Sequence, residues 1–358
     1  MRIDQVLVAA SPGDAITNFA QALRQALAPD VGSDIFARYY HADLAGDVQP
    51  LATYASRQHG GADDRLVFHV SIGEPEVADL VMARPERLVV IYHNISPSAP
   101  FRPFDAAFAD LLDRGRAELL RLPGRATAAM AESHFNAAEL AAVGFSQVGV
   151  VPLIVDLKEL RHGPVDHAMA ARLATQIDGP VILAVGQILP HKRIDFLIEA
   201  FHILSTYLVP EARLILVGPP RLPAYAAAVQ TQIDELHLDR VWMTGSVPQS
   251  ELSAFLGRAD LLASASEHEG FCVPLLEAMS FDLPFQARRF GAIAETAGGA
   301  GLILDPDDGP AVMAEAWATM LGDQALRADL VARGRQRLAD FDPAVTKQAW
   351  RRALLALL

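Results

Sequence analysis

The sequence has one cysteine, Cys272, among its 358 residues. A single cysteine excludes an internal disulfide and makes a cysteine-rich zinc site untenable. No apolar run approaches the roughly 20 residues that cross a bilayer. The first residues, MRIDQVLVAASPGD, lack the apolar segment and the cleavage site of a signal peptide. We therefore expect a cytoplasmic protein that uses no metal.

Positive charge is also scarce. The chain has 43 acidic and 30 basic residues, a net charge of −13, and its lysines stand only at positions 158, 192 and 347. This balance argues against a sequence-independent grip on nucleic acid, which needs a basic face. It leaves room for a local positive pocket that binds a phosphate ligand.

Several signatures of common enzymes are missing. No Gly-x-Ser-x-Gly or Walker pattern occurs, so hydrolase and P-loop functions lack support. The turn after the first apolar run, SPGDAITN, is not the Gly-x-Gly-x-x-Gly fingerprint of dinucleotide binding. A Rossmann dehydrogenase is therefore disfavoured.

Apolar residues, by contrast, make up 51% of the chain. Short apolar runs alternate with segments of helical period, which predicts an α/β fold with doubly wound parallel sheets. The strand-like runs of the first half lie at 5–10, 65–71, 87–93, 126–133 and 147–152. Those of the second half lie at 180–186, 212–218, 240–245, 259–265 and 283–287.

This alternation predicts two domains of similar size. We place the first at 1–155 and the second at 179–340, joined by a linker at 156–178 that shows no strand signal. The final segment, 343–358, predicts a helix with an apolar stripe that must be buried, and we expect it to pack on the first domain. The alternative is a membrane contact, but its two flanking arginines supply too little for stable anchoring.

The sharpest local pattern is SEHEGFCVPLLEAM at 266–279. A strand ends, a loop follows, and a helix begins at Pro274, so the preceding amides of Phe271, Cys272 and Val273 form an anion site. Glu269 and Glu277 could hold sugar hydroxyls and ribose hydroxyls on either side of a diphosphate. The alternative is that Glu277 only complements the helix dipole and that Glu269 is solvated.

A second pattern is VGQILPHKRIDFLIEAF at 185–201, where Lys192 and Arg193 open a helix directly after a strand. Cations at a helix N-terminus are disfavoured by roughly 0.3–1 kcal/mol each. A bound diphosphate would offset that cost, so we expect both residues to bind the donor. The alternative is that both side chains reach into water.

The first half offers weaker candidates. Gly13 and Asp14 lie in the turn after the first strand, where a small-residue loop lets an acceptor or a phosphate approach the backbone. His69 and His93 each end a predicted strand and would face the crevice of a doubly wound sheet. Either histidine could equally be a structural residue whose ring is satisfied inside the protein.

Together these motifs resemble glycosyltransferase family 4, a retaining group with the GT-B fold of two Rossmann-like domains facing a central cleft. The resemblance covers nearly the whole chain and is strongest over 180–306. The segments GDAITN, FHVSIGEP and VIYHNISP are similar to a bacterial subgroup that assembles surface polysaccharide, including lipopolysaccharide. The resemblance implies metal-independent transfer of a hexosyl unit from a nucleotide-diphosphate sugar, without a cofactor.

The resemblance also implies roles for particular residues. Glu269 would touch the donor sugar, Glu277 the ribose and Lys192 the diphosphate, while His93 would position the transferred sugar. We expect His93, Glu269 and Lys192 to be catalytic. The remaining donor-side residues would be Gln187, Arg193, Gly218, Val247, Gly270, Phe271, Cys272 and Val273, and the acceptor-side residues would be Gly13, Asp14, His69 and Ser133.

One departure stands out, because Gln187 occupies a position where the family usually has arginine. A neutral amide gives up a charge-assisted contact to phosphate. This keeps three alternatives open: a nucleotide-sugar epimerase or a sugar phosphorylase on the same fold, or a non-catalytic sugar-nucleotide-binding subunit. As partners we expect GDP-mannose ahead of UDP-sugars, a saccharide or lipid-linked acceptor, and no nucleic acid, with any membrane contact weak and peripheral.

Overall fold

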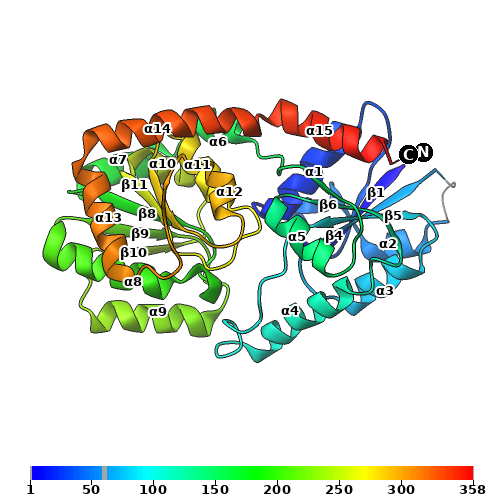
Figure 1. Ribbon diagram of the computed structural model, residues 1–358, viewed down its shortest axis with the longest axis horizontal. Helices are drawn as coiled ribbons and strands as arrows, with labels where there is room; N and C mark the ends of the chain where they lie inside the picture. The colour runs from blue at the N-terminus through cyan, green and yellow to red at the C-terminus, as the bar shows by residue number, and fades with distance from the viewer. Residues whose placement is uncertain (1, 59–62, 358) are drawn as a thin grey trace. The chain divides into compact units, whose positions relative to one another are not determined.

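The computed structural model describes residues 2–58 and 63–357, and the chain divides into two compact units. Unit 1 takes Met1–Ala99, Ala107–Val155 and Phe341–Leu358, and unit 2 takes Pro100–Ala106 and Asp156–Asp340. Each unit contains one parallel sheet with helices against it (Figure 1). The predicted α/β class with two doubly wound sheets is confirmed.

The sheet of unit 1 has the strand order β3-β2-β1-β4-β5-β6-β7, with every pairing parallel. The order reverses between β1 and β4, so the loops after these two strands diverge and open a crevice at the carboxyl edge. The strands are β1 (Ile3–Ala10), β2 (Ile35–Tyr40), β3 (Val48–Pro50), β4 (Arg65–Val70), β5 (Arg87–Tyr92), β6 (Ala126–Ala131) and β7 (Val148–Val150).

The helices of unit 1 begin at residues suited to a first turn. Asp14 accepts from the backbone N–H of Thr17, Ser133 accepts from that of Asn136, and prolines open two further helices. The helices are α1 (Ala15–Leu27), α2 (Leu51–Ser56), α3 (Pro75–Ala83), α4 (Ala106–Leu119), α5 (His134–Ala142) and α15 (Pro343–Leu355), with the short turn η1 (Ala42–Leu44).

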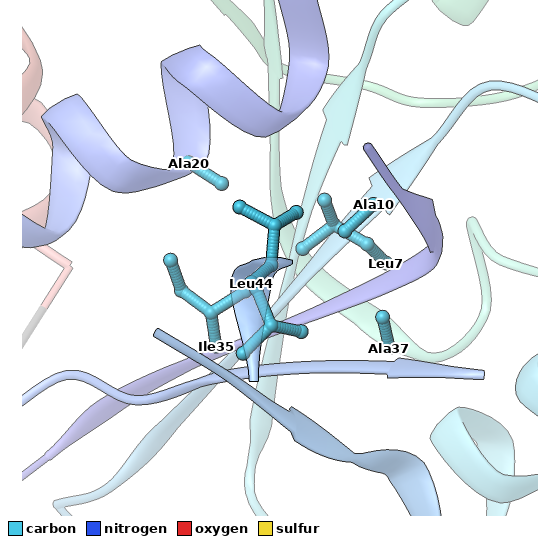
Figure 2. Packing of buried hydrophobic residues seen from close by; sticks show 7 residues of the cluster. Leu7, Ala10, Ala20, Ile35, Ala37 and Leu44 are labelled. Atoms are coloured by element: carbon cyan, nitrogen blue, oxygen red, sulfur yellow. The ribbon is translucent and has the colours of Figure 1, made fainter. Parts of the chain in front are cut away.

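Small side chains let α1 lie close to the sheet of unit 1 (Figure 2). Ala10 of β1, Ala20 of α1 and Ala37 of β2 are almost fully buried, and Leu7 and Leu44 fill the space beside them. A fully buried leucine contributes about 1.5–3 kcal/mol relative to an exposed one. This cluster therefore fixes the backbone from which the loop after β1 departs.

The sheet of unit 2 has the order β10-β9-β8-β11-β12-β13, again with parallel pairings. Here the order reverses between β8 and β11, so the loops after these strands form the crevice of unit 2. The strands are β8 (Val181–Val185), β9 (Arg213–Val217), β10 (Val241–Gly245), β11 (Leu261–Ser264), β12 (Phe285–Arg288) and β13 (Leu302–Leu304).

The helices of unit 2 follow the predicted helical segments closely. They are α8 (Ile194–Ile203), α9 (Pro223–Glu235), α10 (Gln249–Arg258), α11 (Val273–Ser280), α12 (Ile293–Ala297), α13 (Pro310–Gly322) and α14 (Gln324–Leu338). Shorter turns are η2 (Pro190–Lys192), η3 (Leu204–Leu208) and η4 (Ala339–Phe341).

The stretch 156–178, expected as a linker, instead forms α6 (Leu157–His162) and α7 (His167–Gln176) within unit 2. Asp156 and Asp166 each cap one of these helices, and Leu160 is buried. The carbonyl of Leu160 accepts from the hydroxyl of Ser253 in α10 at 3.0 Å. The scattered charges of this stretch are thus helix caps and outer faces, which strand-directed analysis had treated as a connection.

Three strands escaped the sequence analysis: β2, β3 and β13. β3 and β13 are only three residues long, too short for an alternating pattern to register. β2 is buried at its start and exposed from Arg38 onward, so its polar end masks its apolar beginning. Their absence from the prediction left the strand order undetermined.

The C-terminal helix α15 packs on α1 within unit 1 (Figure 1). Trp350 is fully buried, its indole N–H donates to the carbonyl of Pro152 at 2.7 Å, and its ring meets that of Phe19 edge to face at 5.0 Å. Arg351 forms an ion pair with Asp30 of unit 1. The apolar stripe of this helix is therefore covered by protein.

Trp350→Ala is expected to lower the free energy of unfolding by about 3–5 kcal/mol, because it leaves a cavity and an unpaired carbonyl. Deleting 343–358 should lower the melting temperature further and expose apolar surface to a dye. Val345→Ala, on the exposed side of the same helix, is the control and should stay within about 0.5 kcal/mol. Normal melting of the truncated chain, with loss of liposome binding alone, would support the membrane alternative instead.

Candidate functional site

Two loops meet at the crevice of unit 2, one after β8 and one after β11. The ammonium of Lys192 donates to a carboxylate oxygen of Glu269 at 2.6 Å, and the two side chains are 19% and 10% exposed. The two strongest sequence patterns, 77 residues apart, thus converge on one ion pair at the topological switch point. Ligands of doubly wound sheets bind at this position.

Both members of the pair are charged near neutral pH. Burial opposes the charge on Lys192, but the adjacent Glu269 carboxylate outweighs it and raises the pKa of the lysine. Burial likewise opposes the charge on Glu269, and the ammonium outweighs it and lowers the pKa of that carboxyl. The loops therefore present a fixed dipole of opposite charges to a ligand.

Glycines bring the backbones of these loops together. A β-carbon on Gly218, which ends β9 with φ +150°, would lie 1.9 Å from the carbonyl oxygen of Gly186. A β-carbon on Gly291, with φ +56°, would lie 2.3 Å from the carbonyl oxygen of Glu269. Larger residues at either position would displace the loop that carries half of the ion pair.

The segment before α12 holds the loop of Glu269 from behind. The N–H of Ala292 donates to the carbonyl of Glu269 at 2.8 Å, and the hydroxyl of Thr296 donates to that of Phe271 at 2.5 Å. Sequence reasoning missed this support, although Gly291 within PFQARRFGAIAET was a visible signal for a close backbone approach. The buried Phe285 of the same stretch belongs to the core.

Helix α11 starts directly after this loop. Cys272 adopts a left-handed backbone, φ 73°, as its N-cap, and Pro274 stands in the first turn. The positive end of the helix dipole thus lies beside the Lys192–Glu269 pair. Burial raises the pKa of the Cys272 thiol well above its ordinary value, so the thiol stays neutral and is no nucleophile.

Glu277 lies in the second turn of α11 and is half-buried. Within residues 2–58 and 63–357, no hydrogen bond or ion pair is formed by its carboxyl group. Burial raises the pKa of this carboxyl to about 7. A partly buried carboxyl group without protein partners is costly unless a ligand provides them, and ribose hydroxyls are suitable donors.

Gln187 lies beside Lys192 at a cavity of about 20 Å³, which Ser264 and Ser266 also line. That volume holds about one water molecule. The amide of Gln187 makes no hydrogen bond with another residue in the described part of the chain. It is therefore available to a ligand, as a neutral group.

In unit 1, the two predicted histidines contact each other. Nδ1 of His69 lies 2.8 Å from Nε2 of His93, with the rings stacked at an interplanar angle of 8°. Nδ1 of His93 contacts a carboxylate oxygen of Glu132, and Nε2 of His69 lies 2.9 Å from the carbonyl oxygen of Gln5. The side chain of His93 is 2% exposed, so all its ring nitrogens have protein partners.

The other acceptor-side candidates lie at the carboxyl edge of the same sheet. Asp14 and Ser133 cap α1 and α5, so each has a structural role. Gly13 precedes α1 with φ +76°, and a β-carbon there would meet nothing within 4 Å. Gly13 thus leaves the backbone after β1 open to approach.

Residues 168–337 match the sequence profile described as glycosyl transferases group 1. The D-inositol 3-phosphate glycosyltransferase of Kineococcus radiotolerans is 32% identical over 219 residues, which are 57% of this chain and 50% of that protein. The O-antigen chain mannosyltransferase B of Escherichia coli is 30% identical over 161 residues, 44% of this chain and 41% of that protein. Residues 168–337 form a group 1 glycosyl transferase domain.

The matches span about half the length of these curated relatives or less. The fold is supported over the whole chain: the structure of Anabaena HepE with UDP and glucose has a TM-score of 0.79 at 18% identity, covering 99% of this chain and 100% of that one. Together with the two parallel sheets, this likeness confirms the predicted GT-B fold. It is a statement about fold alone.

The glycosyl transferase domain contains Gln187, Lys192, Glu269 and Glu277, whereas the histidine pair lies outside the matched residues. Val247 follows β10, two strands away from β8 in the sheet. The predicted donor residues Gly270, Phe271 and Val273 lie on the loop and first turn that adjoin Glu269.

Arg193 of the glycosyl transferase domain does not need a phosphate to offset its position. Its guanidinium pairs with Asp195 at 3.0 Å and with Glu267, and Arg288 binds the same Glu267 at 3.0 Å. The chain itself thus supplies the anions that the sequence analysis assigned to a diphosphate. Lys192 is left as the cation that faces the crevice loops.

Among the described residues, no helix is both long and apolar enough to span a bilayer.

Proposed function

We propose that this protein is a retaining hexosyltransferase that uses a nucleotide-diphosphate sugar as donor. The observation that carries the proposal is the Lys192–Glu269 pair beside the start of α11, with the partnerless Glu277 one turn further on. A cation, a helix N-terminus and a carboxylate are what a diphosphate, its leaving charge and a ribose require.

In this proposal the diphosphate binds Lys192 and the first amides of α11, and the ribose hydroxyls donate to Glu277. The transferred sugar lies against Glu269. Departure of the diphosphate builds negative charge, which Lys192 and the helix dipole stabilise without reorganisation. Glu269 is held by Lys192 and therefore does not serve as a covalent nucleophile, so the acceptor hydroxyl attacks on the face that the diphosphate leaves.

We propose GDP-mannose as the first donor to test and UDP-sugars next, with a saccharide or lipid-linked saccharide as acceptor. The similarity to an O-antigen chain mannosyltransferase favours mannose and a role in surface polysaccharide assembly. The HepE structure, which holds UDP and glucose on the same fold, supports UDP-sugars as the alternative.

The deciding experiment incubates the full chain with each donor and a panel of saccharide acceptors, and detects the products by mass spectrometry and NMR. The proposal expects one added hexose with the anomeric configuration of the donor. An inverted product would contradict the retaining mechanism. Product from donor alone would indicate an epimerase, product that requires inorganic phosphate and no nucleotide a phosphorylase, and tight binding without turnover a binding subunit.

Transfer is expected to survive excess chelator. Lys192 and α11 supply the positive potential at the diphosphate, and no cluster of three metal-binding side chains occurs among residues 2–58 and 63–357. Rates measured with and without EDTA should agree within twofold or so. A loss of activity in EDTA that Mg²⁺ or Mn²⁺ restores would mean that the leaving diphosphate is stabilised differently.

A further inference from the structure

Four polar side chains cross the interior of unit 1 as one hydrogen-bonded chain, and Gln5 sets its direction. The amide nitrogen of Gln5 donates to the carbonyl of Ala20 and to the hydroxyl of Ser33, both at 3.1 Å. Because the Ala20 carbonyl can only accept, the amide cannot be flipped. The carbonyl oxygen of Gln5 must therefore face Nε2 of His69, and this nitrogen carries a proton.

The second step concerns the other nitrogen of His69. Burial, with the nearby His93, holds the pKa of His69 well below its ordinary value. A neutral imidazole with a proton on Nε2 has a bare Nδ1, which can only accept. Nε2 of His93, 2.8 Å away, must therefore donate to it.

The third step ends at Glu132, which is 4% exposed. With Nε2 of His93 protonated, one further proton lies between Nδ1 of His93 and the Glu132 carboxylate. The groups that face His93 are thus His69 from β4, Glu132 from the end of β6 and the ring of Phe19 from α1 at 5.4 Å. No proton in the chain can reverse its direction without reversing Gln5.

The chain ends at a strained turn. Asn94, directly after His93, has a left-handed backbone with φ 75°, and its amide donates to Asn136 at 2.8 Å and to Glu139 at 3.0 Å. Non-glycine residues rarely adopt this conformation unless their surroundings hold them in it. The carboxyl end of β5 is therefore fixed on both sides of the peptide bond between His93 and Asn94.

We infer that Gln5, His69 and Glu132 are positioning residues for the proposed transfer, which fix the ring of His93, its proton order and the turn at Asn94. The inference rests on the proposed function. It changes the expected role of His93, whose two nitrogens are engaged by protein: the residue orders the strand end beside the crevice of unit 1. A purely structural network would specify the fold and leave the rate of transfer unchanged.

Two substitutions separate these possibilities. Glu132→Gln keeps a hydrogen bond to His93, because the amide can donate to Nδ1, but it removes the shared proton. His69→Phe keeps a stacked ring and removes the acceptor. Both should lower kcat about 10- to 100-fold, as losses of groups that orient a functional histidine do, while the Kd for nucleoside diphosphate stays unchanged. His41→Asn, on an exposed histidine of unit 1, is the matched control.

Proton order is measured independently by ¹⁵N NMR of histidine-labelled protein. We expect His69 to carry its proton on Nε2 alone, and Gln5→Leu to release it into a mixture of tautomers. A proton on Nδ1 of His69 in the wild-type chain would overturn the proton order. Unchanged kcat in both Glu132→Gln and His69→Phe would overturn the positioning role, and so would a loss confined to melting temperature. A wild-type chain that transfers no sugar would refute the proposed function itself, and the tautomers would then show whether the proton order still holds.

Discussion

Lys192→Ala is expected to weaken the binding of a nucleoside diphosphate about 10- to 100-fold. The substitution removes a charge-assisted contact to phosphate, worth about 1.5–3 kcal/mol. It also leaves Glu269 buried without its ammonium partner, so the negative charge in the crevice loops repels the ligand. Calorimetric titration with UDP and GDP measures the effect directly.

The same substitution should cost about 3–5 kcal/mol of stability, since it breaks a largely buried ion pair by removing one partner. The double variant Lys192→Ala/Glu269→Gln removes the orphaned charge and should recover part of that loss without recovering binding. Lys158→Ala, on an exposed lysine of the same unit, is the matched control and should bind normally. Wild-type affinity in Lys192→Ala would remove Lys192 from the donor site.

Glu277→Gln is expected to lower nucleotide-sugar affinity about tenfold or more, because an ionised carboxylate accepts from both ribose hydroxyls and an amide offers one oxygen. The carboxyl has a pKa of about 7 in the free protein. Wild-type affinity should therefore fall as the pH drops from 8 to 6, while that of Glu277→Gln stays flat. A nucleotide-sugar is the right probe because its diphosphate has no proton equilibrium in this range.

The stability of the same variant should move in the opposite direction. The folded chain keeps a proton on Glu277 that the unfolded chain has lost between pH 4.5 and about 7, so stability falls as the pH rises through this window. Glu277→Gln avoids that loss and should be about 1–3 kcal/mol more stable than the wild type at pH 8, with the difference shrinking at pH 5. Equal stability at both values would mean that Glu277 is solvated, and a pH-independent wild-type affinity would remove it from the ribose site.

The donor side was accessible to sequence reasoning because its signals are local. Strand–loop–helix patterns with Pro190 and Pro274 located both crevice loops, and the residues that carry charge there were visible in each. The contact between Lys192 and Glu269 was not predictable, because it depends on β8 lying next to β11. Strand order follows from packing between distant segments, which periodicity does not report.

The histidine chain of unit 1 shows the same limit more strongly. Its four members come from β1, β4 and the ends of β5 and β6, and only two of them were singled out from the sequence. Gln5 was a signal in principle, since a polar residue inside an apolar strand needs a buried partner. Identifying that partner requires the register of β1 against β4, where Leu7 lies opposite His69.

The central claim is that unit 2 binds a nucleoside diphosphate at the carboxyl ends of β8 and β11. The most direct test is a crystal structure of the full chain grown with UDP or GDP, whichever binds more tightly. We predict diphosphate oxygens within hydrogen-bond distance of the Lys192 ammonium and the first amides of α11, and both ribose hydroxyls on the Glu277 carboxylate. A nucleotide bound elsewhere on the chain, with the Lys192–Glu269 pair untouched, would contradict the account.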